Sequence, residues 1–170
     1  DEHGNKSQTA PQRRTYRRLP ELPLVAEIPS LREAVPQRTL VTEGLEDALS
    51  LRAAAAGSRI IAGLGVAGIA RVHVATGEEV IIVRDGDAPD SAASQQLQKA
   101  TDRLTLNGAC VRVTDTPEGM DANDILVRCG AEELLRLVDD APDAVLSADG
   151  WIERCAGMPL LEYERIRGTV

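Results

Sequence analysis

The sequence predicts an α/β fold in which a mainly parallel sheet of about four strands carries helices on both faces. Short apolar runs alternate along the chain with helix-like segments, which is the rhythm of strand–helix–strand units. Hydrophobic residues make up 43% of the 170 residues and aromatic residues only 2%, so Ala, Val, Ile and Leu must build the core. The uninterrupted run VIIV (residues 80–83) is typical of a parallel strand buried on both faces.

Four strands are expected, each as a short apolar run bounded by glycine or polar residues. They are Arg38–Glu43, Arg59–Leu64, Glu79–Val83 and Ala109–Thr114. In an open parallel sheet, ligand sites lie outside the carboxyl ends of the strands. The residues that follow these runs are therefore the first place to search for function.

Helices are expected between and after the strands. Glu46–Ala56 is rich in Ala and Leu and ends at Gly57, as helices often do. Pro89–Asn107 has proline in its first turn and apolar residues at helical spacing. The remaining predicted helices are Val66–Val74, Ala131–Ala141 and Ala148–Arg167, the last with a break at residues 157–159.

Three segments are expected along the chain. Residues 1–37 contain a cluster of arginines without periodicity, and we interpret them as an extended basic arm or linker. Residues 38–145 form the α/β domain, and residues 146–170 form a helical segment that leads to a further region beyond Val170. We expect the chain to be a piece of a longer protein.

Composition narrows the environment and the function. Three widely spaced cysteines without a CxxC pair argue against structural zinc and disulfides and favour a reducing, cytoplasmic setting. No run resembles a membrane span or a signal peptide. One Trp, two Tyr and no Phe argue against a base-stacking module. The net charge of −8 argues against binding nucleic acid by bulk positive charge, but it permits an enzyme that meets phosphates through a metal.

Acidic residues follow three of the predicted strands. They are Glu43 and Asp47, then Asp85 and Asp87, then Asp121 and Asp124. Asp85 and Asp87 are two residues apart, so in an extended chain their side chains point to the same side. The three groups should meet at one edge of the sheet.

Carboxylates gathered in this way repel one another unless a cation lies among them. Two unit charges at ~4 Å repel by about 4 kcal/mol in a surface-like dielectric. Oxygen ligands without His or Cys suit Mg²⁺ or Mn²⁺. We therefore expect a divalent cation at this edge and metal-assisted phosphoryl transfer, with two metals possible.

Each acidic group also has a structural interpretation. Glu43–Asp47 is compatible with the acidic first turn of a helix, which the helix dipole stabilises. Asp85–Asp87 is compatible with a turn, and Asp121–Asp124 with an N-cap before a helix. It is less expected that three independent structural explanations apply at one sheet edge than that the three acidic groups form a single cation site there.

A glycine motif offers another interpretation. Gly63, Gly65 and Gly68 match GxGxxG after a predicted strand, with Asp85 about 20 residues further on, as in dinucleotide sites. The helix that would follow is short, so a plain helix-entry turn is favoured. No P-loop or nucleophile elbow occurs.

Four segments together resemble the motifs of a Toprim domain, most closely that of primases, including primase-helicases of phages and mobile elements. They are VTEGLEDALSL (41–51), IIAGLGVAGIARV (60–72), VIIVRDGDAPDSAA (80–93) and PEGMDANDIL (117–126). The resemblance covers about Arg38–Ala141 and implies a Rossmann-like Toprim fold.

The resemblance also implies roles. Glu43 corresponds to the general acid/base near the metal, and Asp47 to the acid four residues further on. Asp85 and Asp87 correspond to the metal-binding pair, and Asp121 to the first acid of the third motif. Asn123 replaces the second acid of that motif, and Asp124 is displaced by one position.

We therefore predict the Toprim core of a DNA primase, a nucleotidyltransferase that makes RNA primers on DNA with Mg²⁺ or Mn²⁺. Glu43, Asp85 and Asp87 are its predicted catalytic residues. The predicted metal ligands are Glu43, Asp47, Asp85, Asp87, Asp121 and Asp124. The expected partners are template DNA, nucleoside triphosphates and a helicase domain or partner. The alternatives are a metal-dependent Toprim nuclease and a non-catalytic metal-binding module of a replication protein.

Overall fold

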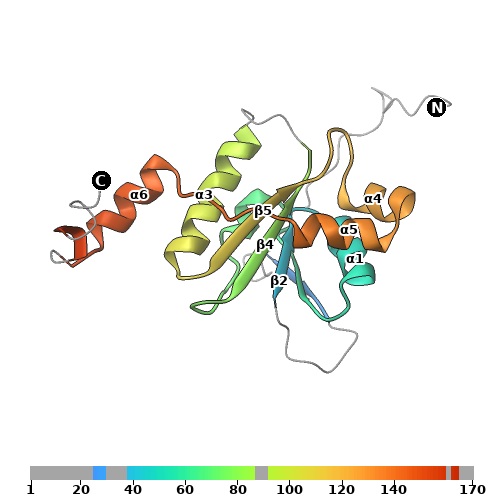
Figure 1. Ribbon diagram of the computed structural model, residues 1–170, viewed down its shortest axis with the longest axis horizontal. Coiled ribbons are helices and arrows are strands. Elements are labelled where there is room, and N and C mark those ends of the chain that lie inside the picture. The colour runs from blue at the N-terminus through green and yellow to red at the C-terminus, as the bar shows by residue number, and fades with distance from the viewer. Residues whose placement is uncertain (1–24, 30–37, 87–91, 160–161, 165–170) are drawn as a thin grey trace, which may run out of the picture.

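The computed structural model describes residues 25–29, 38–86, 92–159 and 162–164, which form three layers with a sheet in the middle (Figure 1). The five strands lie in the order β1-β3-β2-β4-β5. They are β1 (Ala26–Ile28), β2 (Thr39–Thr42), β3 (Arg59–Ala62), β4 (Glu79–Arg84) and β5 (Cys110–Asp115). The predicted mainly parallel α/β fold is confirmed.

The four predicted strands form the parallel part of the sheet, with β2 at its centre. Val41 of β2 is in register with Ile61 of β3 on one side and with Ile82 of β4 on the other. From β2 the chain passes to β3 on one side and then returns to β4 on the opposite side. The loops after β2 and β4 thus begin at neighbouring strand ends and diverge. Open α/β sheets form their binding crevices at such reversals of strand order.

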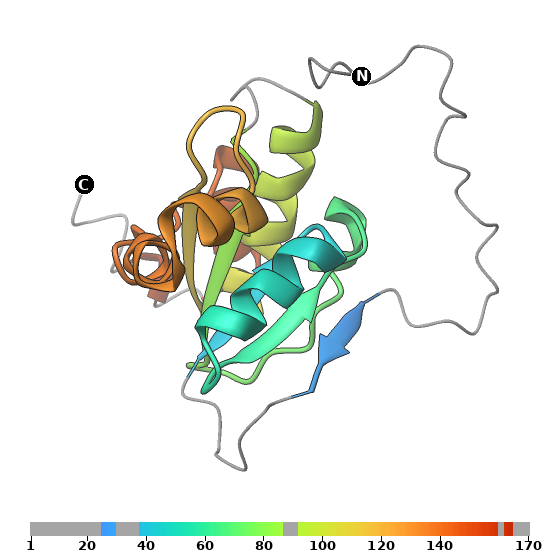
Figure 2. The ribbon, with the colours of Figure 1, turned by 90° about the vertical axis from the view of Figure 1, so that its right-hand side faces the viewer.

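The fifth strand, β1, lies at the edge of the sheet, antiparallel to β3 (Figure 2). Ala26 pairs with Ala62 and Ile28 pairs with Ile60. Arg52 reinforces the edge, because its Nη2 donates to the carbonyl oxygen of Ile28 at 2.7 Å. This strand was not predicted, since three residues within a segment interpreted as an arm are too few to show a period. Residues 26–28 of that predicted arm are therefore part of the sheet.

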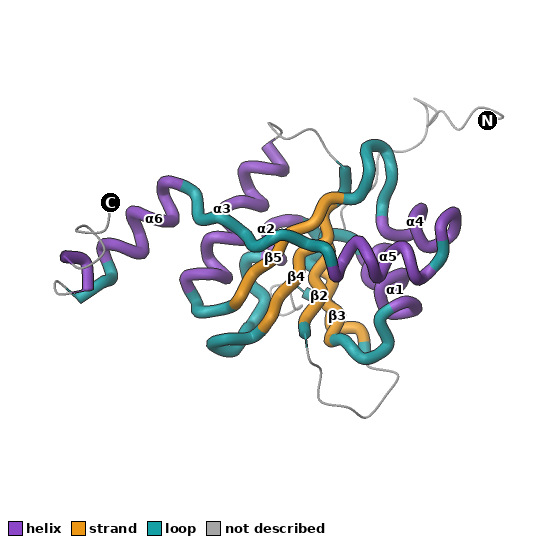
Figure 3. The backbone as a smooth tube through the Cα atoms, in the orientation of Figure 1, coloured by secondary structure: helices purple, strands orange, loops and turns teal. Residues whose placement is uncertain are grey.

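Helices cover both faces of the sheet (Figure 3). Two hydrophobic clusters place α1, α4 and α5 on one face and α2 and α3 on the other, and α6 packs against α3. The helices are α1 (Leu45–Ala54), α2 (Val66–Ile69), α3 (Ala92–Leu106), α4 (Ala122–Cys129), α5 (Ala131–Asp139) and α6 (Ala148–Ala156).

Several helix boundaries differ from the predictions. Helix α2 has four residues where Val66–Val74 was expected, and α4 begins directly after Asp121, where an N-cap before a helix was one of the two interpretations. The start of the predicted helix Pro89–Asn107 and the end of Ala148–Arg167 lie outside the described residues. The described parts, α3 and α6, are helical where the periodicity indicated helices.

Alternate residues of the central strands contact opposite helix layers. Leu40 and Ile81 belong to the cluster under α1, α4 and α5, whereas Val41 and Ile82 belong to the cluster under α2 and α3. All four are fully buried. Burial of each such side chain contributes about 2 kcal/mol, so both layers hold the strand ends in place.

Candidate active site

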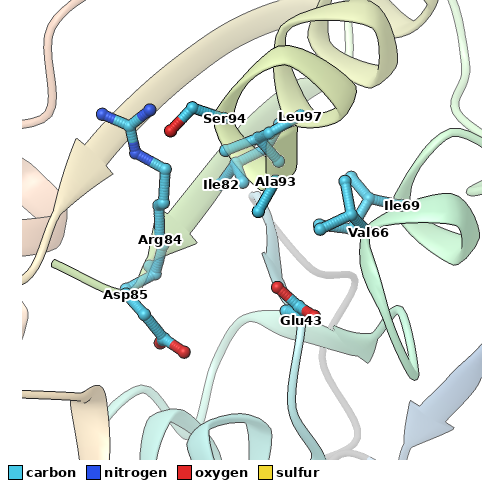
Figure 4. Close-up of a pocket in the computed structure, with 10 residues that line it drawn as sticks. Glu43, Val66, Ile69, Ile82, Arg84, Asp85, Ala93, Ser94 and Leu97 are labelled. Atoms are coloured by element: carbon cyan, nitrogen blue, oxygen red, sulfur yellow. The ribbon is translucent and has the colours of Figure 1, made fainter. Parts of the chain in front are cut away.

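Glu43 and Asp85 extend from the carboxyl ends of the adjacent strands β2 and β4. Both side chains line one pocket, whose far wall is formed by Val66 and Ile69 of α2 and by residues at the start of α3. Figure 4 shows Glu43 between Asp85 on one side and Val66 and Ile69 on the other. The structure thus brings together two of the predicted acids that lie 42 positions apart in the chain.

The glycine motif supports the backbone of Glu43. The Gly65 N–H donates to the carbonyl oxygen of Glu43 at 3.1 Å, and the Gly63 N–H donates to that of Thr42 at 2.8 Å. Gly65 has a φ of 118°, which residues with a side chain rarely adopt. A Cβ on Gly63 would lie 2.8 Å from Cγ1 of Ile69. The motif is a tight turn into the four-residue helix α2, which agrees with the favoured structural interpretation.

The loop that carries Asp85 packs directly against the loop after β5. A Cβ on Gly86 would lie 2.6 Å from the carbonyl oxygen of Pro117 and 2.7 Å from that of Thr116. Real Cβ atoms almost never approach so closely, so this position requires glycine. Asp87, the predicted partner of Asp85 in metal binding, lies outside the described residues.

An ion pair joins the ends of β4 and β5 beside Asp85. Arg84 and Asp115 are opposite each other in the register of the two strands. The guanidinium contacts both carboxylate oxygens, through Nε to Oδ1 and through Nη2 to Oδ2, the latter at 2.6 Å. Figure 4 shows the Arg84 side chain directed toward Ser94, away from the carboxylate of Asp85. Arg84 therefore helps to fix the strand end from which Asp85 extends.

Asp121 and Asp124 lie at the start of α4. Asp121 is the N-cap residue, and its Oδ1 accepts a hydrogen bond from the Asp124 N–H at 2.7 Å. This is the N-cap contact that the structural interpretation predicted. The Asp124 carboxylate pairs with Arg128 one turn later, with Oδ1 and Nη2 2.8 Å apart. The N-cap contact uses one of the two carboxylate oxygens of Asp121.

Asp47 is buried between α1 and the start of α4. Its side chain Oδ1 accepts a hydrogen bond from the Ala122 N–H at 3.1 Å, and the residue is 8% exposed. Burial raises the pKa of Asp47 above its ordinary value, and the nearby charge of Asp121 raises it further. Hydrogen bonds from the backbone of Asn123 and Ala122 act in the opposite direction. The two carboxylates are thus close enough to repel each other.

The donor set fits a partly hydrated Mg²⁺ or Mn²⁺ ion. Among the described residues, no three His, Cys, Asp or Glu side chains lie close enough together to form a metal site by themselves. Mg²⁺ commonly binds through one or two carboxylates, several waters and substrate phosphates. Glu43 and Asp85 provide two carboxylates at one pocket, without the nitrogen or sulfur ligands that zinc prefers.

The residues that hold the acids in place were not predicted from the sequence. Gly86, Arg84 and Asp115 fix the loop of Asp85, and Gly44 gives room to Asp47, since a Cβ there would lie 2.8 Å from Oδ2 of Asp47. The only local signal was the glycine inside each acidic motif, EG at residues 43–44 and DGD at residues 85–87.

Known proteins with similar sequences or structures point to one family. The family model described as "Toprim domain" matches residues 38–132. The solved zinc-binding and RNA polymerase domains of Aquifex aeolicus primase are 26% identical, with a TM-score of 0.52, and the match covers 64% of this chain and 27% of that one. A DnaG primase catalytic domain bound to ssDNA is 25% identical, with a TM-score of 0.51 and coverage of 65% and 36%.

A further structure, the DnaG catalytic core, gives 25% identity, a TM-score of 0.50 and the same coverage of 65% and 36%. No curated protein sequence matches the chain. The matched part is only 27% to 36% of the length of each of these three primase chains.

Proposed function

Because this chain belongs to the Toprim domain family, we propose that it is the catalytic Toprim core of a DNA primase, which joins ribonucleotides into an RNA primer on a DNA template. The observation that carries the proposal is the convergence of Glu43 and Asp85 on one pocket. Identity of 25% to 26% with primase catalytic cores supports this choice among Toprim activities. The activity is assigned to the intact protein, because those cores are about three to four times longer than the matched part.

Each acid has a proposed role. Glu43 acts as general acid/base at the pocket that it shares with Asp85. Asp85, Asp87 and Asp121 are the proposed ligands of the cation. A bound Mg²⁺ or Mn²⁺ ion supplies a positive charge that binds the triphosphate and offsets charge developing during phosphoryl transfer. Arg84 and Gly86 keep Asp85 at the rim of the pocket. Asp47 contacts Ala122 and Asp124 contacts Arg128. Neither acid is among the described residues that line the pocket.

The partners follow from the reaction. Template DNA and nucleoside triphosphates are its substrates, and a helicase domain or partner would supply unwound template. We propose residues 38–145 as the Toprim domain, with β1 from the preceding arm added to its sheet, and residues 146–170 as a helical segment after it. Within the described part of the chain, no helix has both the length and the apolar character that a membrane crossing requires.

Primer synthesis by the intact protein tests the proposal. Glu43→Ala and Asp85→Ala should each lower the rate of ribonucleotide incorporation on single-stranded DNA about 100-fold or more, because they remove acid–base catalysis and a cation ligand. The matched controls Glu132→Ala and Asp149→Ala remove exposed acids from the starts of α5 and α6 and should retain full activity. Undiminished synthesis by both site variants would contradict the proposal.

The other Toprim functions give different results in the same experiment. Metal-dependent nicking of plasmid DNA without primer synthesis indicates a nuclease. A rise in melting temperature with Mn²⁺ but neither activity indicates a non-catalytic metal-binding module. If millimolar Mn²⁺ leaves the melting temperature unchanged, the result contradicts all three functions, because each of them requires a bound cation.

A further inference from the structure

Asp47 directs its carboxylate toward backbone groups and not toward the pocket. One oxygen, Oδ1, accepts the hydrogen bond from Ala122, and the other, Oδ2, lies against Gly44, where a Cβ would stand 2.8 Å from it. The described residues that line the pocket in Figure 4 include Glu43 and Asp85 but not Asp47. Its position differs in this way from that of the two acids that face the pocket.

A second link joins the same two helices. The Ser50 hydroxyl donates to Oδ1 of Asn123 at 3.2 Å. Nδ2 of Asn123 in turn donates to Oε1 of Glu46 at 3.4 Å. An ionised aspartate at position 123 has no N–H to donate and would repel Glu46. The Asn123 amide is therefore better suited to linking the two helices than to binding a cation.

Together these contacts form what we call the α1–α4 junction. It consists of Glu46, Asp47 and Ser50 on α1 and of Ala122 and Asn123 on α4. The junction includes the residue directly after Asp121, so it sets where the Asp121 carboxylate lies relative to the strand ends.

We propose that Asp47 is a positioning residue, which holds the first turn of α4, and Asp121 with it, against α1 and does not bind the cation. The inference rests on the proposed function only in treating Asp121 as a cation ligand. It also accounts for Asn123, because the third motif of this chain then contributes Asp121 to the cation and Asn123 to the junction.

Conservative and non-conservative variants of Asp47 distinguish positioning from ligation. Asparagine keeps an oxygen that accepts the Ala122 N–H but is a poor cation ligand, whereas alanine removes both functions. In titrations of the intact protein with Mn²⁺ alone, we expect Asp47→Asn to bind within about threefold of wild type. Asp47→Ala should bind about tenfold more weakly, as is common for residues that orient a ligand.

The control is Asp85→Asn, which should lose at least as much Mn²⁺ affinity as Asp47→Ala. Equal losses for Asp47→Asn and Asp85→Asn, at an unchanged melting temperature, would overturn the inference. An absence of any Mn²⁺ response in the wild type would instead contradict the proposed function, and the stability measurement below would then decide whether the junction exists.

Gly44 allows an independent test through a double-mutant cycle. Gly44→Ala should lower the melting temperature of the wild type, since its Cβ would meet Oδ2 of Asp47, and should have almost no effect in Asp47→Ala, which lacks that oxygen. Gly57→Ala, with no atom within 4 Å of the new Cβ, should behave alike in both backgrounds.

An equal effect of Gly44→Ala in both backgrounds would refute the contact. If Asp47→Ala does not fold, Asp47→Ser takes its place, because serine also lacks the oxygen beside Gly44.

Discussion

Gly86 is in backbone contact with Pro117, at the point where the loops after β4 and β5 meet. A Cβ on Gly86 would lie 2.6 Å from the carbonyl oxygen of Pro117. The first of these loops begins at Asp85 and the second leads to Asp121. The contact therefore sets the separation between two proposed ligands from different strands.

Gly86→Ala should damage both stability and cation binding. The added methyl group has to push apart two backbone segments, and such overpacking typically destabilises by about 1–3 kcal/mol. Thermal unfolding should show a lower melting temperature, and the rise on addition of Mn²⁺ should shrink. Gly157→Ala, where the nearest atoms would be 3.8 Å from the Cβ, is the matched control and should change neither. A wild-type melting temperature for Gly86→Ala would show that the loops do not touch.

Arg52→Ala should release the edge strand β1. Arg52 is 5% exposed, and its guanidinium donates to the carbonyl oxygens of Ile28 at 2.7 Å and Ser58 at 2.9 Å. Its removal leaves buried acceptors without partners, which costs about 1–3 kcal/mol, as urea denaturation can measure. Arg71→Ala removes an exposed arginine and should have little effect. Backbone amides of β1 should exchange hydrogen faster in Arg52→Ala, and unchanged exchange would argue against this function of Arg52.

Asp102→Ala should loosen α6 without unfolding the sheet. Asp102 on α3 accepts hydrogen bonds from Gln98 Nε2 at 2.9 Å, from the Ser147 N–H at 3.0 Å and from the Ser147 hydroxyl. Gly150 packs on the same carboxylate, since its Cβ would lie 2.8 Å from Cγ. Hydrogen exchange should accelerate in residues 148–156 and remain unchanged in β4. Asp149→Ala serves as the control, because that acid is exposed on α6, and equal acceleration in both variants would contradict the prediction.

Glu78 should make stability depend on pH in the acid range. Burial alone would raise its pKa, but hydrogen bonds from Thr39 and Ala75, together with the charge of Arg59, hold the pKa of Glu78 below its ordinary value. A depressed pKa means that the ionised form stabilises the fold above the unfolded-state pKa, and that this contribution is lost as pH falls through the folded-state pKa.

Glu78→Gln should therefore be less stable than wild type at pH 7, by about 1 kcal/mol, and the difference should vanish in strong acid. Melting curves between pH 7 and pH 3 measure it. Glu132→Gln, an exposed acid on α5, should show no such trend. A difference that is constant across this range would show that the contacts do not favour the ionised form.

Local patterns were sufficient to predict most of the fold. The run VIIV predicts a strand buried on both faces, and Val80–Val83 are all buried in β4. The spacing of Leu97, Ala100 and Leu104 predicts a helix, and these side chains pack on the sheet. Strand β1 lacks such a pattern, because three residues acquire their structure only by pairing with β3.

The site was predictable in part for a similar reason. Acids directly after strands are visible in the sequence, and parallel strands bring their ends to one edge, as Glu43 and Asp85 show. The contacts that place these acids join distant residues. Asp47 and Ala122 are 75 positions apart, and Arg84 and Asp115 are 31 positions apart. No periodicity relates such pairs, so they emerge only from the folded chain.

The return of the chain from β3 to β4 across β2 has a consequence for how this protein can tolerate insertions. The turn at residues 75–78 connects to β4 at the amino end of the strand, where the Gly77 N–H bonds to the carbonyl oxygen of Gly108. Added residues there would lengthen a connection at the edge opposite Asp85. Such an insertion would lengthen the interval between the acidic segments without moving their carboxylates, whereas an extra residue between Glu43 and Asp47, or between Asp85 and Gly86, would displace a carboxylate.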